Sequence, residues 1–523
     1  MPPFFTICDA IYKHQAIWVV EYKSGGLKRD PMFLAVEFVF SPVPLESVLN
    51  PTHNFRIRQT INCATHFPSL APRRRFRNNS SFMSNPPPKY AWYKELTRYQ
   101  WFVLGVCCIG WMFDTMAQQI FNLARKPAIR DLMGAQATDA MGAYATSIFM
   151  LGWATGGVFF GVLGDRIGRV KTMVWTILCY TLFTGLSMLA TGIWDFNAYR
   201  FLCGLGVGGQ FAVGVALVAE VVPARARPYA LGTLQSFSSI GNMLAATVGI
   251  LLGLLERSGT IHGAWRWEFL SGAIPAPLAF LVFRKLKEPE QWLKARAEKK
   301  QLGSYRELLS DPRWGRNSLI GLILAVAGVV GLWGIGYFSY DLFQPVLVRT
   351  FQSQGLSGAA LAGKTTTWIG VTSLFQNLGG FFGVYAFTYL THYTGRLPAF
   401  AVSFLAAMGM TAYTFWHLNA ISDIFWMVPL MGFSQMTLFG GYAIYLPELF
   451  PTRLRSTGTS FCYNVGRAVA ALGPFTFGYL TGSVFKGHAE PMRYAGVSMC
   501  LVFLIGLAAL PFAPETKGKP LPE

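Results

Sequence analysis

The stretch "EVVPARAR" at residues 220–227 recurs as "ELFPTRLR" at residues 448–455, 228 positions later (448 minus 220). Both copies follow the pattern E-x2-P-x-R-x-R. A second pair, "DRIGR" at 165–169 and "HYTGR" at 392–396, repeats with an offset of 227 (392 minus 165). Two independent pairs with nearly the same offset indicate an internal duplication. The sequence therefore predicts a chain built from two similar halves.

Each half is dominated by long apolar stretches. Of the 523 residues, 52% are hydrophobic and 13% are charged, whereas soluble domains contain about 25% charged residues. Stretches of about 20 residues, the length that a spanning helix needs, recur between Trp101 and Phe512. They are too long for barrel strands, and a helix satisfies its own backbone groups in lipid. We predict an all-α membrane protein with twelve transmembrane helices in two parallel six-helix halves.

Basic residues gather in alternate connections between these stretches. The net charge is +19, and the basic clusters lie at 165–171, 223–227, 284–300, 394–396 and 451–455. Because Lys and Arg mark the cytoplasmic side, we expect both termini to be cytoplasmic in a bacterial-type inner membrane. Basic residues dispersed between apolar helices argue against nucleic-acid binding. The eight cysteines have no paired spacing, which favours buried thiols over disulfides or metal ligands.

The composition divides the chain into six parts. Residues 1–82 lack a sustained pattern and are expected to be a disordered or misassigned extension, and 83–99 form a cytoplasmic lead-in. The first six-helix half covers 100–285. A charged cytoplasmic linker with surface helices follows at 286–315, then the second half at 316–512 and a cytoplasmic tail at 513–523.

Several motifs resemble one family. "GVLGDRIGRVK" (161–171) resembles the loop between helices 2 and 3 of the major facilitator superfamily, and "RFLCGLGVGG" (200–209), "PELFPTRLRSTGTSFCYNVGR" (447–467) and "PETKG" (514–518) agree. "GLGVGGQFAVGVALVAE" (204–220) and "IGNMLAA" (240–246) are most similar to sialate and aromatic-acid symporters. The resemblance implies the major facilitator fold and a secondary transporter that works by alternating access, not an enzyme.

Departures from the sugar-porter pattern bear on the substrate. The paired Gln of helix 7 is absent from "VAGVVGLWGIGYFSYDLFQP" (326–345), and the helix-10 Trp is absent from "GGYAIYLPE" (440–448). We therefore expect a proton-coupled symporter of a small organic acid, such as a sialic or aromatic acid. The alternatives are a sugar:proton symporter, a facilitative sugar uniporter, and a transport-dead receptor on the same fold. Only a receptor would be expected to add a signalling domain.

Asp114 is the candidate proton acceptor. It lies within an apolar span, where acids usually face a cavity or a partner. Gln118 and Asn122 follow at i+4 and i+8, so the three residues share one helix face. In proton-coupled relatives, the residues that match Asp114 and Arg200 form a coupled pair, and the resemblance implies the same pair here. The alternatives are a structural hydrogen-bond patch and a static ion pair.

Acidic and basic residues at the inner helix ends are expected to form a cytoplasmic gate. Topology needs only Lys and Arg, so the acids indicate salt bridges between helices. The gate candidates are Gly161, Asp165, Arg166, Gly168, Arg169, Glu220, Arg225, Arg227, Glu448, Arg453 and Arg455. Gly204, Gly206 and Gly209 fit a dinucleotide pattern, but no strand precedes them, and close helix packing is favoured.

Polar residues within apolar spans are the candidate substrate contacts. A site near the bilayer midplane needs such groups from both halves, although each can equally hydrogen-bond between helices. The candidates are Gln118, Asn122, Gln210, Asn242, Tyr337, Tyr340, Gln376, Asn377, Gln435, Asn464 and Arg467. The expected partners are a small-molecule substrate, a proton and the lipid bilayer. No cofactor, metal or nucleic acid is expected, and the chain is expected to work as a monomer.

Overall fold

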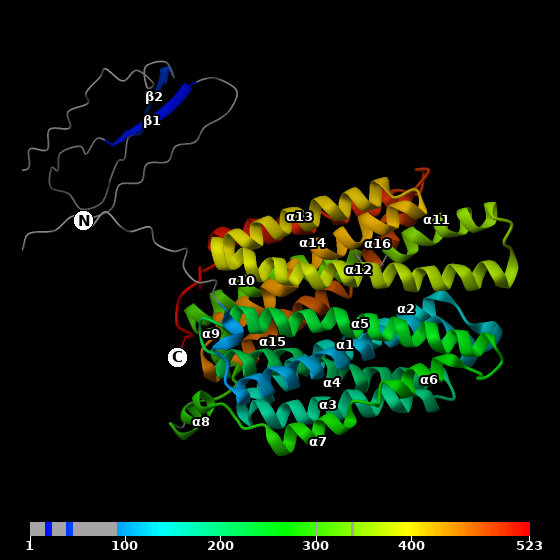
Figure 1. Ribbon diagram of the computed structural model, residues 1–523, viewed down its shortest axis with the longest axis horizontal. Helices are drawn as coiled ribbons and strands as arrows, with labels where there is room; N and C mark the ends of the chain where they lie inside the picture. Colours follow the sequence, from blue (N-terminus) through cyan, green and yellow to red (C-terminus); the bar gives the residue numbers. More distant parts are fainter. Residues whose placement is uncertain (1–15, 23–37, 45–90, 299–300, 336–338, 523) are drawn as a thin grey trace, which may run out of the picture. The chain divides into compact units, whose positions relative to one another are not determined.

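The computed structural model describes residues 16–22, 38–44 and 91–522, except for 299–300 and 336–338. From residue 91 on, long helices lie side by side in one bundle (Figure 1). In the first half, five long helices are followed by a sixth in two pieces: α1 (Arg98–Met133), α2 (Asp139–Arg166), α3 (Arg169–Leu186), α4 (Ile193–Val221), α5 (Arg227–Arg257), and α6 (Ala264–Ser271) with α7 (Ala276–Lys285). The linker forms two short helices, α8 (Glu290–Ala297) and α9 (Tyr305–Ser310).

The second half repeats this plan with more interruptions. Three of its spans are single helices: α12 (Gly358–Thr394), α13 (Arg396–His417) and α14 (Ile421–Glu448). The seventh span consists of α10 (Pro312–Val329), the π-helix η5 (Val330–Ile335) and α11 (Ser339–Ser353). The eleventh consists of α15 (Arg455–Ala470), α16 (Gly473–Tyr479) and the π-helix η8 (Leu480–Val484), and the twelfth of α17 (Pro491–Met499), α18 (Val502–Ala509) and the 3₁₀ turn η9 (Leu510–Phe512). The seventh and eleventh spans approach each other closely near their breaks: a Cβ on Gly473 would lie 2.7 Å from Gly334 Cα.

Nine helices of the described residues are long and apolar enough to cross a membrane, or ten if the bent pair from Ala264 to Ala297 counts as one span. α15 is not among them: it has 16 residues and carries polar side chains that are buried in the bundle, namely Ser456, Thr457, Thr459, Ser460, Asn464 and Arg467. Such a helix is stable in a membrane only where other helices cover it. With α12 and α15 included, the chain forms the twelve spans that the sequence predicts.

Equivalent hydrogen bonds in the two halves confirm the internal repeat. Asp195 accepts from the backbone N–H groups of Thr191 and Gly192 at the start of α4, and Asp423 does the same at the start of α14. The equivalent pairs lie 227 or 228 positions apart and are Asp195 with Asp423, Arg266 with Arg493, and Glu288 with Glu515. The repeat therefore extends beyond the two motifs that revealed it.

The glycines of α4 allow close helix packing, as predicted. A Cβ on Gly204 would lie 2.4 Å from the carbonyl oxygen of Phe149 on α2, and one on Gly206 would lie 2.4 Å from the backbone nitrogen of Tyr180 on α3. A Cβ on Gly209 would lie 2.4 Å from Phe160 Cβ. α4 is thus held against α2 and α3 at distances that only glycine permits.

The residues before position 87 form a separate unit. Within it, β1 (Ala16–Tyr22) pairs with β2 (Phe38–Pro44) as an antiparallel two-stranded sheet. Most of the predicted extension, 1–82, lies outside the described residues, so its assignment as disordered or misassigned stays a prediction.

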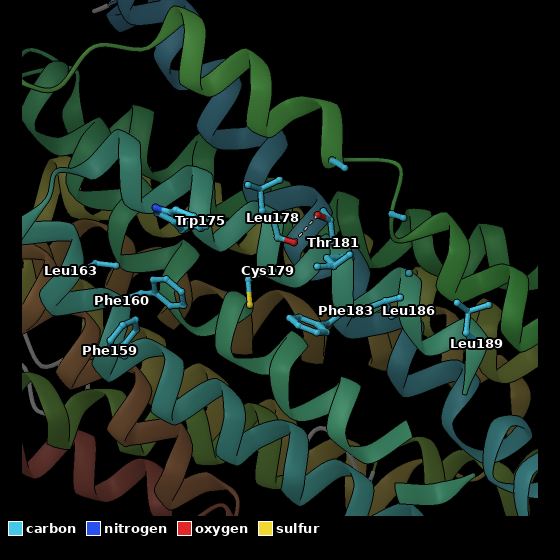
Figure 2. Close-up of a pocket in the computed structure, with 14 residues that line it drawn as sticks. Phe159, Phe160, Leu163, Trp175, Leu178, Cys179, Thr181, Phe183, Leu186 and Leu189 are labelled. Atoms are coloured by element: carbon cyan, nitrogen blue, oxygen red, sulfur yellow. Dashed lines mark hydrogen bonds between the residues drawn. The ribbon is translucent and has the colours of Figure 1, made fainter. Parts of the chain in front are cut away.

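One hollow of the bundle faces outward. It has a volume of about 910 Å³ and lies over α3, between α2 and the pieces of the sixth span (Figure 2). Its lining is apolar, and Phe159, Trp175 and Leu189 are each 59% exposed. Exposed apolar side chains on spanning helices contact lipid, so this hollow is not the solute site.

Candidate functional site

Asp114 lies in the middle of α1 and is fully buried. Gln118, one turn later, donates from Nε2 to Asp114 Oδ2 at 3.1 Å. The other oxygen, Oδ1, has no hydrogen-bond partner among the described residues. The predicted shared face of Asp114 and Gln118 is therefore confirmed. One carboxylate oxygen remains available for a proton or another ligand.

Arg200 does not contact Asp114, contrary to the pairing implied by the resemblance. Its guanidinium donates to Ser187 Oγ at 2.5 and 3.0 Å and to the carbonyl oxygen of Phe183 at 2.9 Å. It also lies over the ring of Phe269, 4.6 Å from the centroid. Arg200 thus joins α4 to the end of α3. In the part of the chain that the structure describes, no ion pair links it to Asp114.

A second buried arginine, Arg467 of α15, lies near Asp114, because its ring partner Trp153 lines the same small cavity as Gln118, the hydrogen-bond partner of Asp114. Its guanidinium lies between two aromatic faces, 3.8 Å from the ring centroid of Trp153 and 3.9 Å from that of Tyr463. One nitrogen, Nη1, donates to Asn464 Oδ1 at 3.3 Å, while Nε has no partner among the residues described. Arg467 is 2% exposed. The two halves therefore bring a buried acid and a buried cation to the same region.

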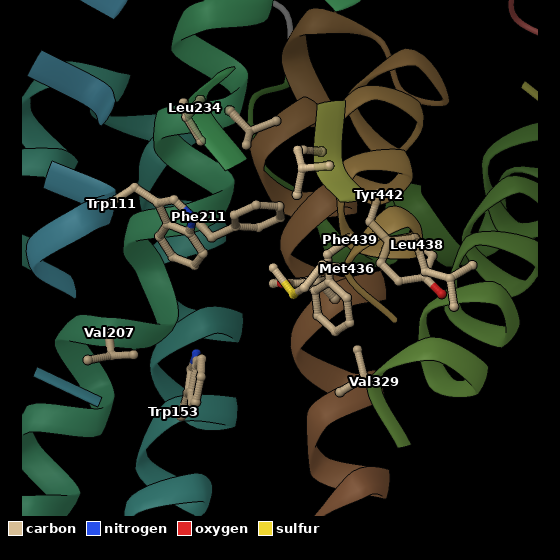
Figure 3. Close-up of a cluster of buried hydrophobic side chains, with 14 of the residues drawn as sticks. Trp111, Trp153, Val207, Phe211, Leu234, Val329, Met436, Leu438, Phe439 and Tyr442 are labelled. Carbon is tan, nitrogen blue, oxygen red and sulfur yellow. The ribbon is translucent and has the colours of Figure 1, made fainter. Parts of the chain in front are cut away.

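Aromatic side chains surround this region. Phe211 of α4 stacks on Tyr463 of α15, with centroids 4.2 Å apart and ring planes at 28°, and Trp111 of α1 lies 5.0 Å from Phe211. Figure 3 shows Trp111, Phe211 and Trp153 of the first half near Phe439 of the second. Within the described residues, neither indole nitrogen, of Trp111 or of Trp153, has a hydrogen-bond partner. The region thus combines flat apolar faces with unused polar atoms.

Other predicted contacts take part in helix packing. Asn242 of α5 donates to Asn377 Oδ1 of α12 at 2.9 Å and so joins the halves. Gln210 accepts from Thr176 Oγ1 at 2.6 Å, which ties α4 to α3. Asn464 donates to the carbonyl oxygen of Gly208 at 3.3 Å, again between the halves.

Two glutamines retain an unused atom. Gln435 donates to Thr411 Oγ1 at 3.0 Å, while its Oε1 and that of Gln376 have no partner within the described chain. Asn122 donates to Gln119 Oε1 at 3.1 Å. Tyr337 lies outside the described residues, as does the side chain of Tyr340.

A charged network closes one end of the bundle. We call this the charged end, defined by Asp165, Arg169, Glu220 and Arg455. Asp165, at the end of α2, accepts from Ser456 N, Thr457 N and Thr457 Oγ1 at the start of α15, at 3.2, 2.8 and 2.6 Å. Carboxylates are stabilised at helix N-termini, so this acid holds the two halves together.

Glu220 extends the network. It accepts from Arg169 at 2.9 and 3.2 Å within the first half and from Arg455 of the second half at 2.7 Å. Its equivalent, Glu448, is bound by Arg396 of the second half and by Thr516 of the C-terminal tail. The predicted salt bridge between helices is therefore present at Glu448, between α14 and α13, but unlike the bond from Arg455 to Glu220 it lies within one half. His392, which replaces Asp165 in the repeat, lies 5.7 Å from the Tyr229 ring of α5 instead.

Glycine and the remaining arginines complete the charged end. A Cβ on Gly161 would lie 2.5 Å from Ser460 Cβ of the other half, and Gly168 precedes α3 with φ 115°. Arg227 donates to the carbonyl oxygen of Ala219 at 2.8 Å, and Arg225 is exposed. Arg227 therefore ties the start of α5 to the end of α4 beside the network.

The linker, predicted to form surface helices, binds both halves at the charged end, where Figure 1 places α8, α9 and the C-terminus. Glu288 accepts from the backbone N–H groups at the start of α3, at 2.7 Å from Arg169. Arg166 donates to the carbonyl oxygen of Gly303 at 3.1 Å, and Arg453 pairs with Glu307 at 2.7 Å. The linker thus connects the α2–α3 turn to the start of α15.

Sequence reasoning missed the aromatic partners of Arg467. Tyr463 precedes Arg467 by one helical turn, a spacing that places both on one face, so a local signal existed. Trp153 has no such signal because it reaches Arg467 from the other half. Glu288 and Glu515 were also missed. Their equivalence at an offset of 227 (515 minus 288) would have revealed them as a pair.

Twelve spans in two similar halves, closed at one end by charged residues, define a multi-pass membrane transporter for solutes. Residues 106–474 match the sequence pattern of the Major Facilitator Superfamily. The chain belongs to this superfamily and is a transporter rather than an enzyme.

Three relatives show the degree of similarity. A "Probable 4-methylmuconolactone transporter" of Cupriavidus pinatubonensis is 30% identical, over 82% of this chain and 94% of that protein. The niacin transporter NiaP of Acinetobacter baylyi is 27% identical, over 81% and 96%. The sialic acid transporter NanX of Escherichia coli is 25% identical, over 80% and 96%.

The solved structure of the proton:xylose symporter XylE bound to 6-bromo-6-deoxy-D-glucose has a similar fold. The TM-score is 0.64, with 17% sequence identity, over 81% of this chain and 98% of that chain. At this identity the likeness establishes the fold alone.

Proposed function

We propose that this protein is a proton-coupled symporter of a small organic acid. The observation that supports the acid is Arg467, a buried guanidinium between Trp153 and Tyr463 whose Nε bonds to none of the described residues. A buried charge is costly unless it is paired. A guanidinium fits a carboxylate with two parallel hydrogen bonds. The flat faces on either side suit an aromatic or sialic acid.

Asp114 is the proposed proton site. When the site is empty and Asp114 is ionised, its charge balances that of Arg467 across the two halves. Protonation of Asp114 removes this balance and leaves Arg467 to bind the carboxylate of the solute. Proton and solute then bind together, which is the requirement for symport.

The names of the relatives support an acid. Two of them are transporters of niacin and of sialic acid, which are both carboxylic acids. A neutral sugar, by contrast, would leave Arg467 without an anion. A sugar:proton symporter, or a sugar uniporter, is therefore the weaker candidate.

We infer that the charged end faces the cytoplasm, because the basic connections lie there. Both termini are then cytoplasmic, in a bacterial-type inner membrane. The bonds of Asp165 and Glu220 between the halves close that side, and alternating access requires them to break when the site opens inward. One chain contains both halves of the site, so a monomer suffices.

The test is uptake into proteoliposomes with and without an inward proton gradient. The solute panel contains nicotinate, N-acetylneuraminate and cis,cis-muconate as acids, with nicotinamide and xylose as neutral controls. We expect accumulation of an acid only when the gradient is imposed, and loss of its binding in Arg467→Gln. Gradient-driven accumulation of xylose instead, unaffected by Arg467→Gln, would refute the acid.

A further inference from the structure

A small cavity lies beside the Asp114 region, on the side away from the charged end. Segments of both halves line it: α1, α2, η5 and α15. The lining residues that matter here are Gln118, Asn122, Thr146, Trp153, Trp333 and Ala470. The space accessible to the centre of a water molecule is about 20 Å³. A water itself occupies about 10–15 Å³ as a sphere of its radius, and any space open to its centre is enough to hold it, so the cavity has room for a water.

Polar groups in the wall suit a bound water. Gln118 uses its amide nitrogen on Asp114, and Asn122 uses its own on Gln119. Their amide oxygens are therefore the groups that can accept from a water. Thr146 donates to the carbonyl oxygen of Gly142 at 2.9 Å and accepts from the guanidinium of Arg125. A buried water typically makes two to four hydrogen bonds, and this wall offers enough polar atoms.

Two tryptophans close the cavity to anything larger. Trp153 of the first half meets Trp333 of the second edge to face, with centroids 5.5 Å apart and planes at 85°. Trp153 also covers Arg467, the proposed carboxylate site. An organic acid cannot pass through a space of this size, whereas a water can. In this state the cavity can therefore hold a water but not an organic acid.

We propose that a water in this cavity delivers the coupling proton to Asp114 from the end of the bundle opposite the charged end, along a route closed to the solute. The proposal rests on the proposed role of Asp114. Asp114 does not line the cavity itself, so the protonated water moves past Gln118 to reach the carboxylate. There one O–H bond of the protonated water breaks and an O–H bond forms on Asp114, which leaves neutral water. Gln118 is the positioning residue, because it contacts both the carboxylate and the cavity.

Charged groups beside the route set the direction of transfer. Arg125 of α1 reaches the cavity wall through its hydrogen bond to Thr146 of α2. Arg467 of α15 reaches it by packing on the ring of Trp153. Both are cations, so a protonated water is disfavoured in the cavity at rest. The proton therefore moves on to Asp114 once that carboxylate is ionised.

The experiment follows Asp114 directly and needs no solute. Time-resolved infrared spectroscopy after a pH drop, on the full-length protein in lipid vesicles, records the carbonyl band of protonated carboxyl groups. The Asp114 band is the one missing in Asp114→Asn. We expect Ala470→Leu, which fills the cavity, and Thr146→Val, which removes the hydroxyl, to slow the appearance of this band about tenfold or more. Its final size should be unchanged.

Thr155→Val is the matched control, because Thr155 lies on the same helix, is exposed, and bonds only its own helix at Leu151. Asn122→Leu provides an independent variant if either of the first two fails to fold. Equal rates in all folded variants would overturn the relay. A spectrum with no band lost in Asp114→Asn would instead overturn Asp114 as the proton site, and with it the proposed function.

Discussion

At the scale of single residues, Asp114 and Arg467 are informative because both are buried charges in a membrane protein. Each comes from a different half, and each keeps one polar atom without a partner among the described residues. Static ion pairs in protein interiors usually have their remaining polar atoms satisfied by additional hydrogen bonds. The incomplete bonding favours groups that change partners during transport.

Asp114→Asn separates coupling from binding. Asn keeps the size of the side chain and a hydrogen bond to Gln118 but cannot take up a proton. We expect gradient-driven uptake of the transported acid to fail while counterflow exchange, which needs no net proton movement, continues. The measurement is the two assays on the same proteoliposomes. If Asp114→Asn still accumulates solute against its gradient, Asp114 is not the coupling residue.

Arg200→Lys tests the structural role of Arg200. The guanidinium holds Ser187 Oγ and the Phe183 carbonyl oxygen at once, and a Lys ammonium cannot reproduce this geometry. We expect the variant to lose about 1–3 kcal/mol of stability, measured as a lower midpoint of thermal unfolding in detergent. The affinity for the solute should change little in the folded fraction. A normal unfolding midpoint with lost proton coupling would instead favour the Asp114 pair implied by the resemblance.

At the scale of elements, acidic side chains at helix N-termini place the helices of the charged end. Glu288 binds the start of α3, and Glu515 binds the start of α13 through Arg396 N and Leu397 N at 2.9 and 3.1 Å. Each acid comes from the segment that follows its own half. The linker and the C-terminal tail are thus attached in the same way, by a glutamate that accepts hydrogen bonds from backbone N–H groups at the start of a helix.

Glu515 makes the tail attachment sensitive to acid. Burial raises the pKa of Glu515, but the backbone amides of Lys517, Leu397 and Arg396 outweigh it and hold the pKa below its usual range. A lowered pKa stabilises the folded state above the unfolded value, about 4.3, and this stabilisation is lost as the pH falls through the lower folded value. We expect limited proteolysis of the tail to be constant from pH 8 to about 5 and to rise below about 4.

Glu515→Gln is the matched variant for this prediction. It should cost about 1 kcal/mol or less of tail docking, because one charged helix cap is lost. The tail should then be cleaved faster at neutral pH, with little further change in acid. Cleavage that rises in acid equally in Glu515→Gln and in the unaltered protein would show that another group is responsible.

At the scale of the whole molecule, the two halves are similar but their contacts at the charged end are not. Asp165 and Glu220 bond across the interface, while the equivalents of these two positions, His392 and Glu448, contact Tyr229 and their own half, respectively. The halves therefore meet at the charged end along two seams: charged hydrogen bonds of Asp165 and Glu220 hold one, and the aromatic contact of His392 with Tyr229 holds the other. Salt and substitution should weaken these two contacts differently.

Asp165→Asn should open the charged end, and Glu448→Gln should not. Hydrogen bonds to a charged group contribute about 1.5–3 kcal/mol, so their loss shifts the population of the closed state by roughly tenfold or more. The measurement is labelling of Ser460→Cys by a membrane-impermeant maleimide from the side of the charged end. Ser460 is buried in the interface and donates to the carbonyl oxygen of Gly157. Equal labelling in both variants would contradict the distinction between the seams.

Much of the fold was predictable because it depends on local and periodic features. Apolar length predicts the spans, and the repeated motifs predict the halves. The hydrogen bond between Asp114 and Gln118 in α1 was predictable for the same reason, because the two residues lie one helical turn apart. The spans that were hardest to recognise by composition, such as α15, carry polar residues because other helices cover them. Their burial depends on the packed bundle, which no local window reports.

The sequence by itself determined the superfamily, the twelve spans, the duplication and the position of Asp114. Only the tertiary structure decided which cation faces that acid. Arg200 and Arg467 are both arginines in apolar spans, and nothing in their local sequence distinguishes their roles. Packing of α4 turns Arg200 toward Ser187, whereas packing of the second half against the first brings Arg467 to Trp153, beside the cavity that Gln118 lines. The physical reason is that the approach of Arg467 to the Asp114 region depends on how the two halves pack against each other, and helix periodicity carries no information about that.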